Sequence, residues 1–213
     1  MRMTKDNGEI YRLLDSMHGG AECELNFGSP FELLVAVVLS AQCTDKRVNA
    51  VTAELFKVAN TPQQFVDMPA EELERRIFSC GFYRNKARAI KELSASIIEL
   101  GGMPDTREEL MQLRGVGRKT ANVVYAVAYG GNAIAVDTHV FRVANRIGLV
   151  DAKTPEQTEE QLMLNFDENL WSHLHHLLIF QGRYVCHSRN PECGVCALKE
   201  YCKHYKKNIG QRP

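Results

Sequence analysis

The chain has 213 residues, 45% of them hydrophobic, and its 26 lysine and arginine residues balance 26 aspartate and glutamate residues. This composition excludes collagenous, low-complexity and disordered proteins, and a chain of this length can bury a core without a disulfide scaffold. A net charge of zero excludes no class of partner, because a local basic patch can bind a polyanion while the total stays neutral.

The N-terminal segment and the apolar runs indicate neither export nor a membrane helix. Met1 to Glu9 contains no apolar core of the signal-peptide type and carries acidic residues that transit peptides avoid. The longest apolar run, Leu33 to Leu39, has seven residues, against the roughly 20 that a membrane helix requires. We therefore expect a soluble protein of the cytoplasm.

Helix-start signals recur along the chain and predict a nearly all-helical fold. Three of them combine a hydroxyl residue, a proline, and a glutamate or glutamine two positions later, namely Ser29-Pro30, Thr61-Pro62 and Thr154-Pro155. Thr106 begins a fourth such pattern without the proline. Four glycines stand where helices would end: Gly81, Gly101, Gly130 and Gly148.

Strand-type alternation is scarce, and its best example, Ala133 to Val136, is too short to form a sheet. The turn Gly130-Gly131-Asn132 is the clearest internal boundary. It separates a helical stretch, Phe31 to Tyr129, from a C-terminal section that ends in clustered cysteines. The sequence thus predicts an all-α fold in two parts.

Four basic residues follow one another without an intervening acid: Arg84, Lys86, Arg88 and Lys91. A solvated helix face is the simpler interpretation of such a cluster, and a surface for a polyanion is the alternative.

A glycine-containing turn, Leu113 to Gly117, separates two predicted helices. Such a turn exposes consecutive backbone N–H groups beside a helix N-terminus, where a phosphate can bind whatever the sequence of the nucleic acid. A purely steric use of glycine is the alternative. Lys119 favours the functional interpretation, because a cation in the first turn opposes the helix dipole and indicates a bound anion or a chemical role.

Lysine chemistry at this position would need a neutral amine, which a free lysine presents in about one molecule in 2,500 at pH 7, a handicap of about 4.6 kcal/mol. Burial, the neighbouring Arg118 and the helix end would each lower that barrier. Asp137 precedes a predicted helix, Val140 to Ile147. It is a helix cap or, if the fold brings it near Lys119, a carboxylate that stabilises positive charge or assists proton transfer.

Four of the seven cysteines lie within 17 residues, as Cys186, Cys193, Cys196 and Cys202. Four soft ligands in one loop are typical of a metal site, and the irregular gaps favour a [4Fe-4S] cluster over zinc, with unliganded thiols as the third alternative. The remaining cysteines, Cys23, Cys43 and Cys80, are scattered, and we expect core positions for them. Three histidines on the predicted helix Trp171 to Gln181 are additional candidate ligands that more simply pack or face solvent: His173, His175 and His176.

Three motifs together resemble the endonuclease III family of the helix-hairpin-helix DNA glycosylase superfamily. They are LRGVGRKTANVV from Leu113, VDTHVFRVANRIG from Val136, and the C-x6-C-x2-C-x5-C tail. The resemblance runs from about Leu33 to Cys202, with the motifs in the family's order and spacing. It implies two helical domains, a six-helix bundle over 22–132 that carries the helix-hairpin-helix and an iron-sulfur domain formed by 1–21 with 133–213.

The resemblance further implies a bifunctional enzyme of base excision repair. It would excise oxidised pyrimidines from duplex DNA through a Lys119 Schiff base, assisted by Asp137, and then nick the strand at the abasic site by β-elimination. The four cysteines of the tail would hold a [4Fe-4S] cluster. We expect a monomer, which is the default for an enzyme that must travel along DNA, without membrane contacts and associated with the bacterial nucleoid in the cytoplasm.

The implied DNA contacts are carried over by motif. Gln42 would enter the gap left by the flipped base, Phe82 would wedge the duplex, and Arg189 would hold DNA from the loop between the first two cysteines of the tail. The hairpin residues whose N–H groups would meet a phosphate are Gly115, Val116 and Gly117.

Two residues depart from the family pattern, since Arg114 replaces the usual hairpin proline and Phe82 the usual leucine wedge. The first puts the rigidity of the hairpin in doubt, and the second the opposite-base or lesion preference. Two alternatives stay open at this point: a monofunctional glycosylase, whose relatives carry serine or tyrosine in place of Lys119, and a non-catalytic iron-sulfur protein that binds DNA or transfers electrons.

Overall fold

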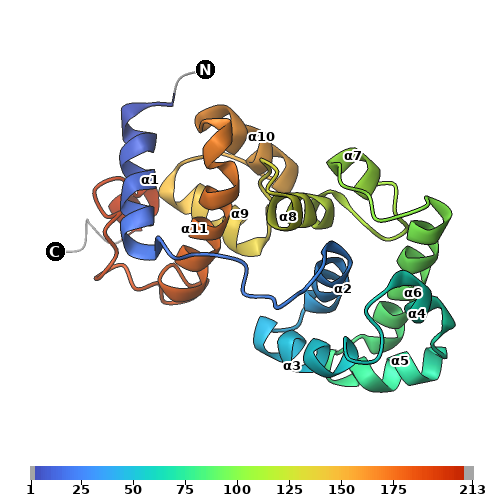
Figure 1. Cartoon of the computed structure of the whole chain (residues 1–213). Helices are drawn as coiled ribbons and strands as arrows, with labels where there is room; N and C mark the ends of the chain where they lie inside the picture. The colour runs from blue at the N-terminus through green and yellow to red at the C-terminus, as the bar shows by residue number, and fades with distance from the viewer. Residues whose placement is uncertain (1–2, 209–213) are drawn as a thin grey trace. The chain divides into compact units, whose positions relative to one another are not determined.

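The computed structural model describes residues 3–208, and every regular element among them is helical, which confirms the all-α prediction (Figure 1). The chain divides into two compact units. One is continuous, Glu24–Gly131, and is called the bundle unit below; the other joins the N-terminal segment up to Cys23 with the residues from Asn132 onward and is called the cysteine unit. No helix within 3–208 is long and apolar enough to cross a membrane.

The bundle unit is organised around α2, whose side chains are apolar on nearly every face. Leu33, Leu34 and Val35 are fully buried, and the helix packs against both α6 and α8, as expected for a helix that is hydrophobic all round. The elements of this unit are α2 (Pro30–Ser40), α3 (Asp45–Leu55), α4 (Pro62–Asp67), α5 (Ala70–Ile77), η1 (Phe78–Cys80), α6 (Tyr83–Glu99), α7 (Arg107–Leu110) and α8 (Arg118–Tyr129).

The predicted helix boundaries are confirmed at their caps. The hydroxyls of four residues accept the backbone N–H three positions on: Ser29, Thr61, Thr106 and Thr154. Only Thr61 forms the full reciprocal box with Gln64. Gly130 and Gly148 end α8 and α9 in the left-handed conformation, with φ of 66° and 97°, because only glycine adopts it without a steric penalty.

The cysteine unit is built on two helices that pack closely, α9 and α11. Gly182 of α11 allows this approach, since a Cβ there would lie 2.8 Å from Cβ of His139. The elements of this unit are α1 (Lys5–His18), α9 (Thr138–Ile147), α10 (Pro155–Asn165), η2 (Glu168–Leu170), α11 (Trp171–Tyr184) and α12 (Lys203–Asn208).

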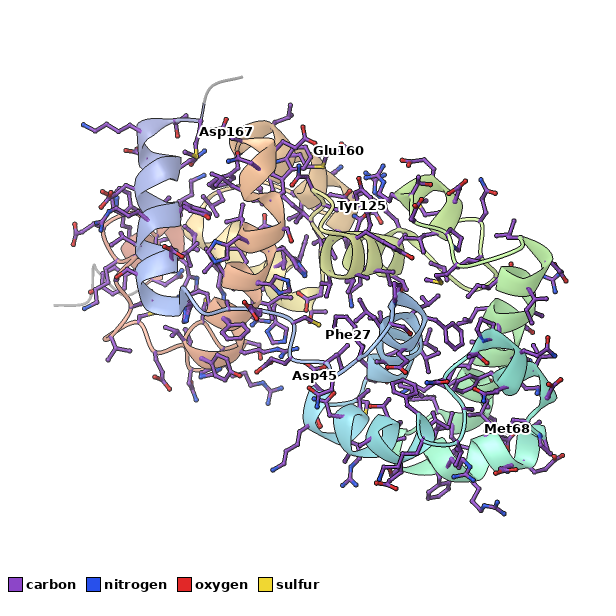
Figure 2. All side chains as sticks on the ribbon, in the orientation of Figure 1. Phe27, Asp45, Met68, Tyr125, Glu160 and Asp167 are labelled. Carbon is purple, nitrogen blue, oxygen red and sulfur yellow. The ribbon has the colours of Figure 1, made fainter. Side chains whose placement is uncertain are left out.

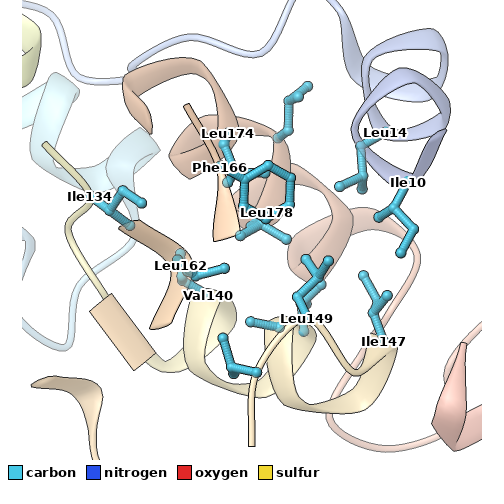
Figure 3. Packing of buried hydrophobic residues seen from close by; sticks show 14 of the residues in the cluster. Ile10, Leu14, Ile134, Val140, Ile147, Leu149, Leu162, Phe166, Leu174 and Leu178 are labelled. Carbon is cyan, nitrogen blue, oxygen red and sulfur yellow. The ribbon is translucent and has the colours of Figure 1, made fainter. Parts of the chain in front are cut away.

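The N-terminal helix belongs to this unit because it completes its core. Ile10 and Leu14 of α1 are buried in one apolar cluster with Val140 of α9 and Leu174 of α11 (Figure 3). Helix α1 therefore packs on α11 although more than 150 residues of sequence separate them.

The basic cluster of α6 is not a uniformly solvated face. Lys86 is 5% exposed, and its Nζ donates to the carbonyls of Leu39 and Cys80, both at 2.9 Å. Lys91 donates to three carbonyls at the end of α4, those of Phe65, Val66 and Met68, the last labelled in Figure 2. These ammonium groups cap helix C-termini, where the helix dipole favours cations, so the solvated-face interpretation is wrong for these two lysines.

Candidate active site and cysteine cluster

The hairpin between α7 and α8 is held by one internal backbone bond. Val116 donates its N–H to the carbonyl of Leu113 at 3.1 Å, and its side chain is buried. Gly115 adopts a left-handed φ of 78° beside it. The expectation that Val116 offers its N–H to a phosphate therefore needs correction, because this group is already bonded within the turn.

The start of α8 leaves donors available next to cations. Gly117 is the N-cap and has no side-chain capping bond, so the N–H groups of the first turn lack a cap of the Ser/Thr/Asp type. Lys119 lies in this turn with its side chain exposed. Burial, one of the three influences expected to make its amine reactive, is absent. Arg114, by contrast, pairs with Glu99 at 3.3 Å on the surface.

Gln42 and Phe82 both have left-handed backbones, with φ of 53° and 47°. This conformation is sterically costly for residues other than glycine, and such strain gathers at functional sites. Gln42 is exposed just beyond the end of α2. Phe82 is 62% exposed, so it is a hydrophobic side chain that faces solvent and takes no part in the core.

The segments that carry these two residues are joined through Lys86. Its ammonium group bridges the carbonyl of Leu39, near the end of α2, and that of Cys80, at the end of η1. Both carbonyls lie within three residues of the strained positions in sequence. A buried cation thus fixes the spacing of the two loops.

Asp137 caps α9 in the cysteine unit. Its Oδ1 accepts the N–H groups of His139 and Val140, both at 2.8 Å. Its other carboxylate oxygen, Oδ2, takes no part in these bonds. The capping role weighed from the sequence is confirmed, and it leaves one oxygen of a firmly oriented carboxylate for further contacts.

The four tail cysteines are half-buried and line one small cavity. Burial raises the pKa of the Cys193 thiol, and the nearby Cys186, Cys202 and Cys196 raise it further. Burial likewise raises the pKa of Cys202. Sulfur atoms separated by up to 16 positions in sequence are thus gathered in one place, although no three side chains among residues 3–208 meet the geometric requirements for holding a single metal ion.

Two arginines one turn apart on α9 hold the loop that begins at Cys186. Arg146 donates to the carbonyls of His187 at 2.6 Å and Ser188 at 2.9 Å, and contacts Sγ of Cys186 at 3.6 Å. Arg142 donates to the carbonyl of Cys186 at 3.2 Å. Sequence reasoning missed both residues, although two arginines at i and i+4 in VFRVANRIG are a readable sign of one basic helix face.

A buried amide supplies a further donor to the cysteine sulfurs. Gln181 is 1% exposed, and its Nε2 donates to Sγ of Cys196 at 3.3 Å while its Oε1 bonds His18 at 2.8 Å. N–H donors directed at sulfur stabilise thiolate ligands and tune iron-sulfur centres. Four thiols with guanidinium and amide donors around them fit a cluster held by thiolates.

The histidines of α11 pack within the unit, as the simpler interpretation held. His173 bonds the hydroxyl of Tyr11 at 2.8 Å. His175 is buried, and burial lowers the pKa of His176. None of the three lines the cysteine cavity.

Arg189 is exposed in the loop between Cys186 and Cys193. The next residue, Asn190, has a left-handed φ of 50°. Within 3–208, the non-glycine residues of positive φ are Gln42, Phe82 and Asn190. Each of them is a predicted DNA contact or its immediate neighbour. Backbone strain therefore adds Asn190 to the candidates, which no sequence pattern had indicated.

Comparison with known proteins gives consistent matches over most of the chain. Residues 35–168 match the model of the HhH-GPD superfamily of base excision DNA repair proteins. An endonuclease III of Bacillus subtilis is 50% identical over 197 residues, covering 91% of this chain and 90% of the relative. An endonuclease III of Escherichia coli K12 is 46% identical over 186 residues, covering 86% of this chain and 88% of the relative.

Solved structures agree with these sequence matches. A trapped covalent endonuclease III–DNA intermediate matches with a TM-score of 0.90 at 48% identity, covering 96% of this chain and 99% of the other. A non-covalent endonuclease III–DNA complex matches with a TM-score of 0.91 at 47% identity, covering 98% and 100%.

Proposed function

This chain belongs to the endonuclease III family of the HhH-GPD superfamily of base excision DNA repair proteins, and from that membership we propose how it acts. The family resemblance of its motifs is confirmed. The chain is a DNA N-glycosylase with abasic-site lyase activity. We propose that its substrates are oxidised pyrimidines in duplex DNA, and that it acts as a monomer on the bacterial nucleoid.

Lys119 is the proposed nucleophile. It attacks C1′ of a nucleotide turned out of the duplex, and the bond from C1′ to the base breaks as the base leaves with the electron pair. The nitrogen then loses a proton, and its lone pair breaks the bond from C1′ to the ring oxygen O4′, which takes up a proton, so that an imine forms at C1′. The imine acidifies the proton on C2′, and loss of that proton expels the 3′ phosphate and nicks the strand. The observation that carries this role is the exposed position of Lys119 in the first turn of α8, where the helix dipole gives a cation no structural benefit.

Asp137 is the proposed assisting carboxylate. Its cap bonds to His139 and Val140 orient it through Oδ1, so Oδ2 is available to stabilise the developing positive charge on the sugar. This role requires that the two units bring Asp137 and Lys119 to the same nucleotide.

The proposed DNA contacts are of two kinds: some position the strand, and others insert a side chain into the duplex. Gly115 and Gly117 in the hairpin would present N–H groups to a phosphate, which positions the strand without reading its sequence. The exposed, strained Gln42 and Phe82 would enter the duplex, where they replace the stacking and pairing lost on base flipping. Arg189 would contact the backbone from the cysteine loop.

A [4Fe-4S] cluster is the proposed cofactor, held by Cys186, Cys193, Cys196 and Cys202. When bound, it supplies iron–thiolate bonds that fix the loop, in a role that is mainly structural. The loop then presents Arg189 to DNA. Purified protein should therefore be brown with visible charge-transfer absorbance, whereas a colourless protein with one zinc ion would contradict the assignment.

Borohydride trapping tests the proposed chemistry, because it reduces the imine and leaves the protein covalently attached to abasic-site DNA. Lys119→Gln should form no adduct while it still binds the duplex. A matched control, Lys153→Gln, removes an exposed lysine of the cysteine unit and should trap like the unmodified protein. Normal crosslinking and nicking by Lys119→Gln would show that the nucleophile is wrongly assigned.

The same assay separates the alternatives. A monofunctional glycosylase excises the base without forming an adduct, and a non-catalytic iron-sulfur protein neither excises nor traps. Duplexes that each carry one defined lesion, incubated with the unmodified protein, test the proposed preference for oxidised pyrimidines.

A further inference from the structure

Two cysteines outside the tail meet in the bundle unit, although the sequence suggested separate core positions. Cys43 is half-buried between α2 and α3, and Cys80 is buried at the end of η1. The Cys43 thiol lies near enough to Cys80 to raise the pKa of the Cys80 thiol. They come together because α3 packs against η1 and because Lys86 bridges the carbonyls of Leu39 and Cys80.

The two thiols differ in accessibility. Cys80 is 2% exposed, and burial, with Cys43 beside it, raises the pKa of its thiol to about 11. Lys86 and Arg47 lie near enough to oppose this shift. Since Cys43 is the partner that solvent reaches, a small oxidant would meet Cys43 first and Cys80 would be the second thiol to react.

The position of the pair links it to DNA binding. Cys43 directly follows Gln42, and Cys80 precedes Phe82 by two residues. Gln42 and Phe82 are the two strained, exposed side chains that the proposed function inserts into the duplex. The distance between the two sulfur atoms therefore constrains the distance between the two inserting residues.

We propose that Cys43 and Cys80 form an oxidation site for peroxides, and that the resulting disulfide weakens the binding of damaged DNA. The effect on DNA rests on the proposed function, whereas the oxidation itself does not.

A peroxide would oxidise the two thiols to a disulfide in two steps. The Cys43 thiolate attacks a peroxide oxygen and the O–O bond breaks, which gives a sulfenic acid and, after proton uptake, one water. The Cys80 sulfur then attacks the Cys43 sulfur, the S–S bond forms, and hydroxide leaves as a second water with the thiol proton. Two thiols lose two electrons, and the peroxide is reduced to two waters.

The disulfide changes the spacing of the loops. Bonded sulfurs lie about 2.05 Å apart, much closer than two unbonded sulfur atoms can approach. Oxidation therefore draws the turn after α2 toward the end of η1. Two side chains can enter a duplex together only if their spacing fits it. In positioned reactions a misplacement of about 1 Å can lower the rate about a hundredfold. For the affinity of the oxidised protein for abasic-site duplex we expect a loss of about tenfold or more.

The test uses the full-length protein with its cofactor in place. After brief treatment with about one equivalent of hydrogen peroxide, non-reducing peptide mapping should find one Cys43–Cys80 disulfide, and the dissociation constant for abasic-site duplex should rise at least about tenfold. Dithiothreitol should reverse both changes. Visible absorbance recorded on the same sample must be unchanged, so that damage at the tail cysteines does not account for the loss.

Three variants make the test specific. Cys43→Ser and the volume-reducing Cys80→Ala should bind DNA normally and lose sensitivity to peroxide. Cys23→Ser, which removes the third cysteine outside the tail, should stay sensitive. Absence of the Cys43–Cys80 peptide, or a disulfide that forms without weakening DNA binding, would overturn the proposal.

The results distinguish a failure of the proposed oxidation site from a failure of the proposed function. Untreated protein that traps on abasic DNA but forms no disulfide contradicts only the oxidation site. Protein that forms the disulfide but never traps contradicts the lyase assignment and leaves the thiol chemistry in place.

Discussion

Replacement of Arg146 by alanine should release the cysteine loop from α9. The guanidinium makes two short bonds to loop carbonyls, 2.6 Å to His187 and 2.9 Å to Ser188, and a longer contact of 3.6 Å to Sγ of Cys186. Alanine removes all three while it keeps the helix, since it has the highest helix propensity. The loop then depends on Arg142 and on the cysteines themselves.

The expected loss follows from the two short bonds. A hydrogen bond to a charged group contributes about 1.5–3 kcal/mol to stability. Arg146 is half-buried, so water competes for the same carbonyls, and each of its bonds should contribute an energy at or below the lower end of this range. We therefore expect Arg146→Ala to destabilise the cysteine unit by about 2–3 kcal/mol. Arg146→Lys should recover less than half of this, because an ammonium group cannot reproduce the fork of the guanidinium.

Two measurements check this expectation. Urea unfolding followed by helical circular dichroism gives the change in stability, and hydrogen exchange reports the protection of backbone amides from Cys186 to Asn190. The matched control is Arg12→Ala on α1, whose 2.6 Å ion pair with Glu9 is solvent-exposed, so its removal should leave the unfolding midpoint in urea unchanged.

The result that would refute this reasoning is specific to the loop. If Arg146→Ala unfolds within about 0.5 kcal/mol of the unmodified protein and loop amides exchange at the same rate, the arginine bonds do not hold the loop. If the free energy of unfolding falls but the backbone amides of the loop exchange no faster, Arg146 stabilises the packing of α9 and not the loop.

Four further changes have defined outcomes. Gly182→Ala should lower the free energy of unfolding by about 1–3 kcal/mol, because its Cβ would lie 2.8 Å from Cβ of His139; thermal unfolding measures this. Lys86→Met should destabilise by about 2–4 kcal/mol, since it leaves two buried carbonyls unpaired. Phe82→Ala should leave stability within about 0.5 kcal/mol, because the ring is 62% exposed, while weakening lesion binding in a gel-shift assay. Asp137→Ala should cost about 0.5–2 kcal/mol through the lost cap, whereas Asp137→Asn should keep the fold and slow borohydride trapping.

Helix boundaries were readable from the sequence because their causes are local. Ser29, Thr61, Thr106 and Thr154 cap helices through hydroxyls that reach only three residues along the chain, and Gly148 ends α9 because its own backbone needs a positive φ. The candidate residues Lys119 and Asp137 were found in the same way, from their positions at helix starts.

Only the tertiary structure decided how residues distant in sequence are used. Lys86 and Lys91 stand in an ordinary basic run, yet their ammonium groups cap helices that end elsewhere in the chain. Cys43 and Cys80 become neighbours because α3 packs against η1, and Phe82, which has a left-handed backbone, faces solvent instead of joining the core. Caps and glycine stops depend on a few neighbouring atoms, whereas burial and pairing depend on which helices pack together, and no local pattern encodes that choice.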